Sequence, residues 1–155
     1  MFSTDIANIL GQDHRVAPHF MGVFACDRLP QVSNRQSYCL ISNLDESHEP
    51  GSHWICLHIV NTTCYYFCSL NTKPNAHLSN YMKQFKRIVR NSCGPQMDNE
   101  ITCGGYCVFV LAMLYRKQSF KAICNFFDII KHDDTFIRYF MHEAYSYTFA
   151  PVSSI

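Results

Sequence analysis

The stretch of sequence that decides the fold is QMDNEITCGGYCVFVLAMLYR, which runs from Gln96 to Arg116. It opens with polar residues, reaches Cys103 and a pair of glycines, and ends in ten consecutive apolar or aromatic residues, 106–115. A charge-free run of that length predicts a buried helix, which we expect over residues 103–117. Cys103 then stands at the helix N-terminus, where unpaired backbone N–H groups favour the thiolate form of a nucleophilic cysteine.

Upstream of this helix the sequence predicts a small sheet. Residues 53–60 (HWICLHIV) and 64–70 (CYYFCSL) are rich in β-branched and aromatic residues and are separated by a short polar turn, so we expect a hairpin. Shorter extended segments precede it at 20–24 and 37–41. The apolar residues of the hairpin are nearly continuous, which indicates strands covered on both faces.

The segments before and after these strands have apolar residues at helical spacing. This spacing predicts helices at 5–10, 77–90 and 135–147, and another that Ser119 caps. A central, mostly antiparallel sheet packed against the buried helix that carries Cys103 is an α+β fold. A chain of 155 residues corresponds to one ordinary domain, so we expect a single domain over 1–155.

Composition limits the function classes. The formal net charge is +1, so the whole molecule has no strong field, and nucleic acid would need a local basic patch. The first residues, MFSTDIANILGQDH, lack the basic start and apolar core of a secretory signal. The apolar run at 106–115 is shorter than the roughly 20 residues that a bilayer requires, so no membrane association is expected.

The sequence contains nine cysteines, an odd number, and most lie within apolar segments. We therefore expect reduced, mostly buried thiols in an intracellular protein. A disulfide framework is the alternative. A zinc site built on Cys93, Cys103 and Cys107 is not expected, because the chain has no C-x-x-C pair and the spacing fits no common zinc module.

Three residues are candidates for cysteine-peptidase chemistry. Cys103 is the candidate nucleophile, and the neighbouring glycines would let a substrate backbone approach its sulfur. His53 follows a Pro-Gly-Ser loop and starts a strand beside Trp54, a suitable place for a general base. Gln96, seven residues before Cys103, can donate its amide to an oxyanion. Taken singly, each residue has a structural role as its alternative, as for the helix cysteine Cys107.

In combination these segments resemble the adenovirus-type, or adenain-like, cysteine peptidases. The likeness looks closest to the adenain-like peptidases of Polinton/Maverick transposons and adintoviruses. It covers about residues 20–116 and rests on five matching segments: Phe20–Pro30, Leu40–Asn43, Gly51–Trp54, Tyr65–Asn71, and Gln96 with Cys103–Cys107. The most specific features are the His-Trp pair and the spacing from the glutamine to the cysteine.

The resemblance implies a fold shared with adenain and with the peptidases of ubiquitin-like proteins. It implies that His53 is the general base, Cys103 the nucleophile and Gln96 the oxyanion donor. The implied function is a thiol endopeptidase that cleaves capsid or core precursors of a virus or virus-like element during particle maturation. Such an enzyme would act as a monomer in the host nucleus or the virion, on substrates with glycine near the scissile bond.

One position departs from the family pattern. Cys68 stands where the family usually has an aspartate or glutamate that orients the histidine. A protonated thiol is a weak hydrogen-bond acceptor without charge, so Asn71, Cys68 itself or no residue at all orients His53. Two alternatives for the function remain open: a peptidase of ubiquitin-like modifiers, and a peptidase-derived binding domain with impaired catalysis.

Four basic residues follow one face of the helix predicted at 77–90: Lys83, Lys86, Arg87 and Arg90. Because adenovirus peptidases are stimulated by DNA, the resemblance implies that these residues contact phosphates and that DNA acts as an activator. A solvated helix surface is the alternative. The peptide cofactor of adenain is not expected, because no cysteine occupies its attachment position.

Overall fold

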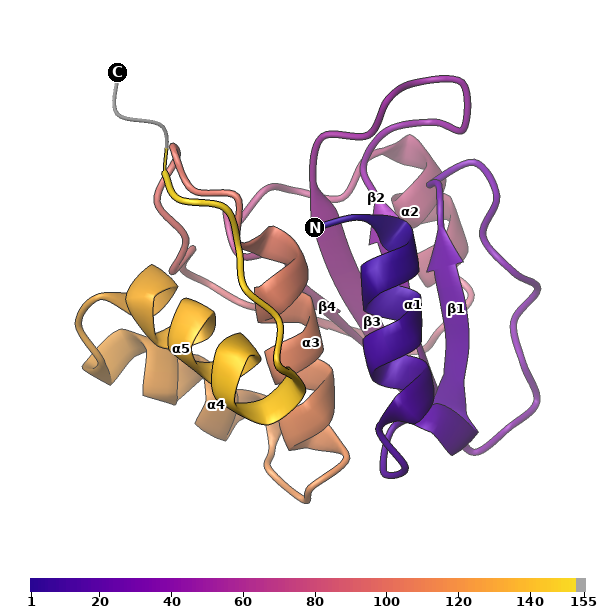
Figure 1. Ribbon diagram of the computed structural model, residues 1–155. Helices are drawn as coiled ribbons and strands as arrows, with labels where there is room; N and C mark the ends of the chain where they lie inside the picture. The colour runs from indigo at the N-terminus through magenta and orange to yellow at the C-terminus, as the bar shows by residue number, and fades with distance from the viewer. Residues whose placement is uncertain (153–155) are drawn as a thin grey trace.

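A computed structural model describes residues 1–152 and shows a five-stranded sheet flanked by helices (Figure 1). The strands follow the order β1-β2-β3-β4-β5 across the sheet. The three central strands, β2, β3 and β4, are antiparallel to one another, whereas the edge strands β1 and β5 pair in parallel with β2 and β4. The strands are β1 (Phe20–Phe24), β2 (Ser37–Asn43), β3 (Trp54–Val60), β4 (Thr63–Phe67) and β5 (Arg87–Arg90).

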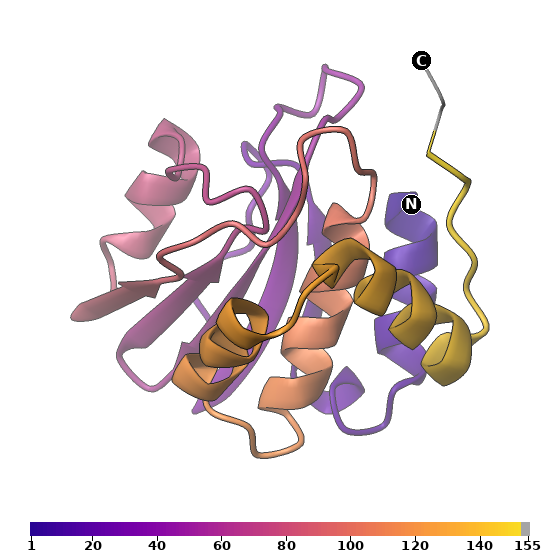
Figure 2. The same ribbon diagram turned by 90° about the vertical axis from the view of Figure 1, so that its left-hand side faces the viewer.

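The helices form a layer on each face of the sheet. Figure 2 shows α2 on one side of the strands and the remaining helices on the other. This arrangement confirms the predicted α+β fold, with α3 ending three residues before the expected end at 117. The helices are α1 (Ser3–Gln12), the 3₁₀ turn η1 (Ala17–His19), α2 (Ala76–Met82), α3 (Cys103–Leu114), α4 (Phe120–Ile129) and α5 (Asp133–Tyr145).

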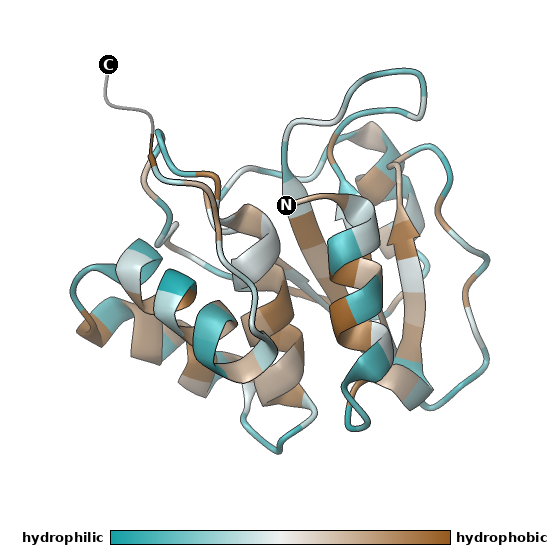
Figure 3. Cartoon of the chain, in the orientation of Figure 1, coloured by the Kyte–Doolittle hydropathy of each residue, from teal (hydrophilic) through white to brown (hydrophobic). Residues whose placement is uncertain are grey.

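Two hydrophobic layers hold the sheet between these helices. Successive residues of β2 alternate between them, with Cys39 and Ile41 facing α3, and Tyr38 and Leu40 facing the opposite layer. The central strands are therefore covered on both faces, as their nearly continuous apolar sequence predicts. Figure 3 shows α3 in brown within this arrangement, and nearly all of its residues are buried. A helix without a polar face must be enclosed on all sides.

The prediction of a helix over residues 77–90 is wrong beyond Met82. Helix α2 ends at Met82, a turn follows, and Arg87–Arg90 form the edge strand β5. The backbone of β5 pairs in parallel with β4, with Val89 opposite Tyr65. The β-branched pair Ile88-Val89 suits a strand, and pairing with the open edge of the sheet outweighs the helical spacing of the segment.

The basic helix face predicted for DNA is therefore wrong as well. Lys83 lies at the C-cap of α2 and Lys86 in the following turn. Arg87 and Arg90 are three positions apart on a strand, so their side chains leave opposite faces of the sheet. The Arg90 guanidinium lies 5.6 Å from the ring centroid of Tyr66. The four cations do not form one stripe.

All nine cysteines are free, and seven of them are buried. Among the described residues, 1–152, no helix is long and apolar enough to cross a membrane.

Two buried histidines make the fold sensitive to acid. Burial lowers the pKa of His53 to about 4, and burial together with the nearby His19 lowers the pKa of His58 to about 4. His58 packs against the rings of Tyr65 and Tyr115, and its Nδ1 has no hydrogen-bond partner within the described part of the chain. Both imidazoles are consequently neutral in the folded protein at neutral pH.

We predict that the free energy of unfolding falls as the pH drops from about 6.5 towards 4. The folded-state pKa values are depressed, so between these limits the unfolded chain binds more protons than the native one. Each histidine contributes a loss of roughly 2 kcal/mol at pH 5. Urea unfolding at pH 7.5 and 5.0 measures this difference in the free energy of unfolding.

His58→Phe should remove about half of the pH dependence, whereas His48→Gln, at an exposed histidine, should leave it unchanged. If His58→Phe shows the same pH dependence as wild type, the assignment to His58 is contradicted.

Candidate active site

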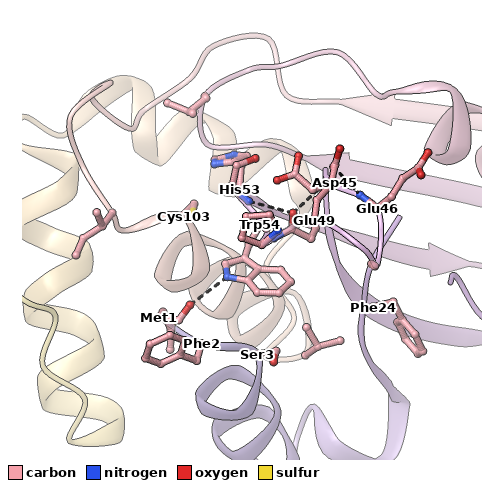
Figure 4. A pocket seen from close by; sticks show the side chains of 18 of the residues that line it. Met1, Phe2, Ser3, Phe24, Asp45, Glu46, Glu49, His53, Trp54 and Cys103 are labelled. Carbon is pink, nitrogen blue, oxygen red and sulfur yellow. Dashed lines mark hydrogen bonds between the residues drawn. The ribbon is translucent and has the colours of Figure 1, made fainter. Parts of the chain in front are cut away.

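A cleft of about 750 Å³ opens beside the N-terminus of α3 (Figure 4). Its lining includes the three residues that the sequence singles out: His53, Gln96 and Cys103. They come from the start of β3, from the irregular segment before α3, and from the first turn of α3. The fold thus brings together residues that are up to 50 positions apart in the sequence.

Cys103 is the first residue of α3 and is only 9% exposed. Burial raises the pKa of its thiol above the ordinary value, and the backbone N–H groups of Trp54 and Gly104 offset part of that rise. The helix N-terminus is expected to favour the thiolate, but desolvation outweighs this contribution, so the pKa of Cys103 is raised. The influence of the Trp54 N–H places the sulfur next to the start of β3.

The loop before β3 fixes the position of His53. The carbonyl of His53 accepts a hydrogen bond from the N–H of Leu44 at 3.0 Å. The side-chain oxygen of Asn43 accepts N–H bonds from Asp45 at 2.9 Å and from Ser52 at 3.3 Å. Gly51 completes the loop with a φ of +84°, which side chains rarely tolerate. Hydrogen bonds within this loop therefore hold His53 at the edge of the cleft.

The two ionisable groups of the site are neutral at rest. The pKa of His53 is lowered to about 4, and that of Cys103 is raised, in both cases chiefly by burial. At pH 7 a neutral imidazole faces the same cleft as a neutral thiol. A neutral imidazole can accept a proton, which is what a general base requires.

Cys68 contacts the ring of His53. Its sulfur lies 3.3 Å from Nε2, so Nδ1 is the ring nitrogen left for another partner. The sulfur also accepts the backbone N–H of Thr72 at 3.3 Å. When Nε2–H donates to this sulfur, Nδ1 keeps the free lone pair that a base needs; when the thiol donates to Nε2, the proton sits on Nδ1 and blocks it.

The amide of Asn91 holds Cys68 in place. It accepts the N–H of Cys68 at 2.9 Å and donates to the Cys68 carbonyl at 2.7 Å. Asn71, the other candidate for orienting His53, instead donates its amide to the carbonyl of Ser92 at 3.0 Å. Asn71 has a φ of +55°, the left-handed conformation that asparagine tolerates.

Two hydrogen bonds hold the side-chain amide of Gln96 and leave one of its N–H hydrogens free. Its Oε1 accepts the hydroxyl of Ser69 at 2.6 Å, and its Nε2 donates to the carbonyl of Glu100 at 2.8 Å. A side-chain amide has two N–H hydrogens, so one remains for an acceptor in the cleft. The Gln96 side chain can therefore serve as an oxyanion donor.

Asp134 is a residue whose role the sequence does not reveal. Its buried carboxylate accepts the Thr102 hydroxyl at 2.7 Å, the Tyr106 hydroxyl at 3.0 Å and the Met97 N–H at 3.0 Å. These bonds join the first turn of α5 to the segment that carries Gln96 and to the start of α3. The sequence marks Asp134 only as a residue of a helix start, because its partners are distant in the chain.

The predicted role of the paired glycines is wrong. Neither Gly104 nor Gly105 lines the cleft. A Cβ at Gly104 would lie 2.8 Å from the sulfur of Met1, and one at Gly105 would lie 2.7 Å from Ile137 and 2.8 Å from Phe149. The glycines let other parts of the protein pack against α3, and they do not make room for substrate.

Within residues 1–152, no three His, Cys, Asp or Glu side chains gather as a metal ion would require.

The fold of this chain is one that proteases use. Among solved structures it is similar to the ASFV pS273R protease, with a TM-score of 0.68 and 15% identity over 90% of this chain and 64% of that one. A Se-Met structure of the same protease gives a TM-score of 0.66 and 14% identity over 92% and 66% of the two chains. The SUMO protease Ulp1 is 17% identical over 82% and 73%, with a TM-score of 0.49.

The likeness to the ASFV protease extends to the fold alone, since the identity is low and this chain spans only 64% of its length. No protein-family model and no curated protein matches the sequence.

We predict opposite effects of alanine at two helical glycines. Gly105→Ala should lower the free energy of unfolding by about 1–3 kcal/mol, because the added methyl group would overlap Ile137 and Phe149. Gly11→Ala should raise it by about 1 kcal/mol, because Gly11 lies in α1 with open space around it. Urea unfolding of both variants tests the prediction, and a neutral or stabilising Gly105→Ala would contradict the packing role of this glycine.

Proposed function

We propose that this protein is a cysteine peptidase in which Cys103 is the nucleophile and His53 the general base. The observation that carries the proposal is the convergence of three residues on one cleft, with the far ring nitrogen of His53 held by Cys68. A fold shared with the ASFV pS273R protease supports it, as does the resemblance of residues 20–116 to adenain-like peptidases.

The reaction begins with proton transfer within a neutral pair. Nδ1 of His53 accepts the proton of the Cys103 thiol as the sulfur attacks the carbonyl carbon of a peptide bond. The resulting oxyanion accepts hydrogen bonds from the backbone N–H of Cys103 and the free amide hydrogen of Gln96. His53 then returns the proton to the leaving amine, and an acyl thioester remains on Cys103. Water, activated by the same imidazole, hydrolyses this thioester.

Cys68 acts as a positioning residue in this scheme. In the proposed scheme the 3.3 Å contact is an Nε2–H bond to the sulfur, which selects the tautomer in which Nδ1 is free. A neutral sulfur stabilises the imidazolium of the transition state less than a carboxylate would, since hydrogen bonds to charged groups are roughly twice as strong. We therefore expect an active site with a lower rate than an aspartate at this position would give.

The substrates we propose are capsid or core precursor proteins of a virus or virus-like element, cleaved during particle maturation. This choice follows the resemblance to the peptidases of adenoviruses, Polinton/Maverick elements and adintoviruses. Incubation of the purified protein with a capsid precursor and with a ubiquitin-like fusion protein, followed by mass spectrometry of the products, compares the two substrate classes. Cleavage of the ubiquitin-like fusion alone would make the protein a peptidase of modifiers, and cleavage of neither by wild type would leave a binding domain.

We predict that iodoacetamide labels Cys103 and that His53→Ala lowers the labelling rate at pH 7 at least 100-fold, the usual contribution of a general base. Peptide mapping separates Cys103 from the other eight cysteines. Because both groups are neutral at rest, the wild-type rate should rise continuously with pH, without the low-pH plateau of a preformed ion pair. His58→Ala is the matched control, since His58 is similarly buried but does not line the cleft.

Equal labelling of Cys103 in wild type and His53→Ala would contradict the proposed pair.

We predict that Cys68→Asp raises the rate of Cys103 labelling at pH 7 about tenfold, because a carboxylate stabilises the imidazolium by roughly 1–1.5 kcal/mol more than a thiol does. The pH dependence should also change: the gain should be largest near neutral pH and shrink at alkaline pH. Cys68→Ser should resemble wild type, and Cys68→Ala should be slower than both. Cys26→Asp, at another buried cysteine outside the cleft, controls for the effect of a buried charge on the fold. An unchanged pH profile in Cys68→Asp would show that Cys68 does not act on His53.

A further inference from the structure

Most of the charged groups that line the cleft are acidic. They include five carboxylates and neither a lysine nor an arginine. Met1 also lines the cleft, and its N-terminal ammonium is the cation that acts on Cys103. Asp45, Glu46 and Glu49 belong to the loop before β3, and Asp98 and Glu100 to the segment before α3. In Figure 4 the acidic side chains of the first loop lie along the cleft beyond His53, away from Cys103. The formal charge of the whole chain is +1, so this negative lining is a local feature.

Two of the five carboxylates bond side chains of other residues. Glu46 bonds Nε2 of His77 at 2.8 Å, and Glu100 bonds Arg138 at 2.8 Å. Glu49 accepts only the backbone N–H of Glu46, at 3.1 Å. The side chains of Asp45 and Asp98 have no hydrogen-bond or ion-pair partner within residues 1–152. Three uncompensated carboxylates therefore face the cleft, and they are available to a cationic ligand.

Apolar side chains make up another part of the lining. Val23, Phe24, Trp54, Leu70 and Ile101 also line the cleft. Apolar walls lower the local dielectric and focus the field of nearby charges into the cleft. A lining that combines apolar surface with carboxylates matches lysine and arginine, whose aliphatic stems lie along apolar surface while the charged head reaches an anion. A small metal ion fits less well, since no three ligand groups gather around one point within residues 1–152.

We propose that the cleft selects a polypeptide segment with lysine or arginine side chains next to the bond presented to Cys103, and that Asp45 and Glu49 provide most of this selection. The proposal rests on the proposed peptidase function, because it names the substrate class of the same site. The two residues flank the turn that leads to His53, so a basic side chain bound there holds the neighbouring backbone against the nucleophile.

A test that needs no peptidase activity compares two thiol reagents of similar size and opposite charge. In methanethiosulfonates carrying either a trimethylammonium or a sulfonate group, the Cys103 sulfur attacks the sulfenyl sulfur, and methanesulfinate leaves as the mixed disulfide forms. We define the ratio as the cationic over the anionic rate at Cys103, divided by the same quotient for free 2-mercaptoethanol. At low ionic strength this ratio should be about ten, and salt should reduce it. The double variant with Asp45→Asn and Glu49→Gln should bring the ratio close to one. Glu143→Gln, an exposed carboxylate on α5 outside the cleft, should leave it unchanged.

The outcomes separate the inference from the function it rests on. A ratio near one in wild type, or a ratio unaffected by the double variant, overturns the charge selection whatever the peptides show. Loss of the ratio on addition of millimolar Ca²⁺, with stoichiometric Ca²⁺ binding by calorimetry, overturns it in favour of a cation site. A high ratio without cleavage of any peptide upholds the charge selection and rejects the peptidase. Faster cleavage of a Lys/Arg-containing peptide than of its alanine-substituted form, with the preference lost in the double variant, supports both.

Discussion

Helix α3 is apolar on every side, and its burial determines the chemistry of the cleft. The helix packs on β3 and against α1, α4 and α5, so its first residue is already desolvated. Burial therefore raises the pKa of Cys103 in spite of the helix end, and it lowers the pKa of the neighbouring His53 to about 4. The same enclosure that builds the core leaves a neutral thiol and a neutral imidazole lining one cleft, which we propose are the nucleophile and the base. In the proposed mechanism, thiolate formation is therefore coupled to proton transfer and does not precede it.

Buried polar residues fix the remaining parts of the site to this helix. Asp134 joins α3 to α5 and to the segment that carries Gln96. The side-chain amide of Asn91 forms two hydrogen bonds with the backbone of Cys68. Both side chains satisfy several partners at once, so the loss of either would leave buried groups unpaired. Cys68 occupies a place where a buried carboxylate would stabilise the imidazolium more strongly. A thiol there avoids the cost of burying a charge, and it still offers the imidazole an acceptor.

Much of this fold follows from sequence pattern, and the exceptions have physical causes. The charge-free run after Cys103 and the β-rich central segments predict α3 and the three central strands, because burial on all sides leaves no polar positions. The segment of β5 has helical spacing in isolation, and only the open edge of β4 makes it a strand. The glycine pair after Cys103 indicates that some group approaches the helix backbone closely. The sequence does not reveal that these groups are the side chains of Ile137 and Phe149. Likewise, the contacts of Asp134 join segments that sequence spacing cannot relate.

The central claim is that His53 is a neutral imidazole whose Nδ1 is free to take the proton of Cys103. Nitrogen NMR of the protein with ¹⁵N-labelled histidine measures protonation and tautomer of this ring directly. The account predicts that His53 stays neutral at pH 7 with its proton on Nε2, that it titrates near pH 4, and that alkylation of Cys103 shifts the Nδ1 resonance. A doubly protonated His53 at pH 7, a proton on Nδ1, or an Nδ1 resonance indifferent to alkylation of Cys103 would contradict it.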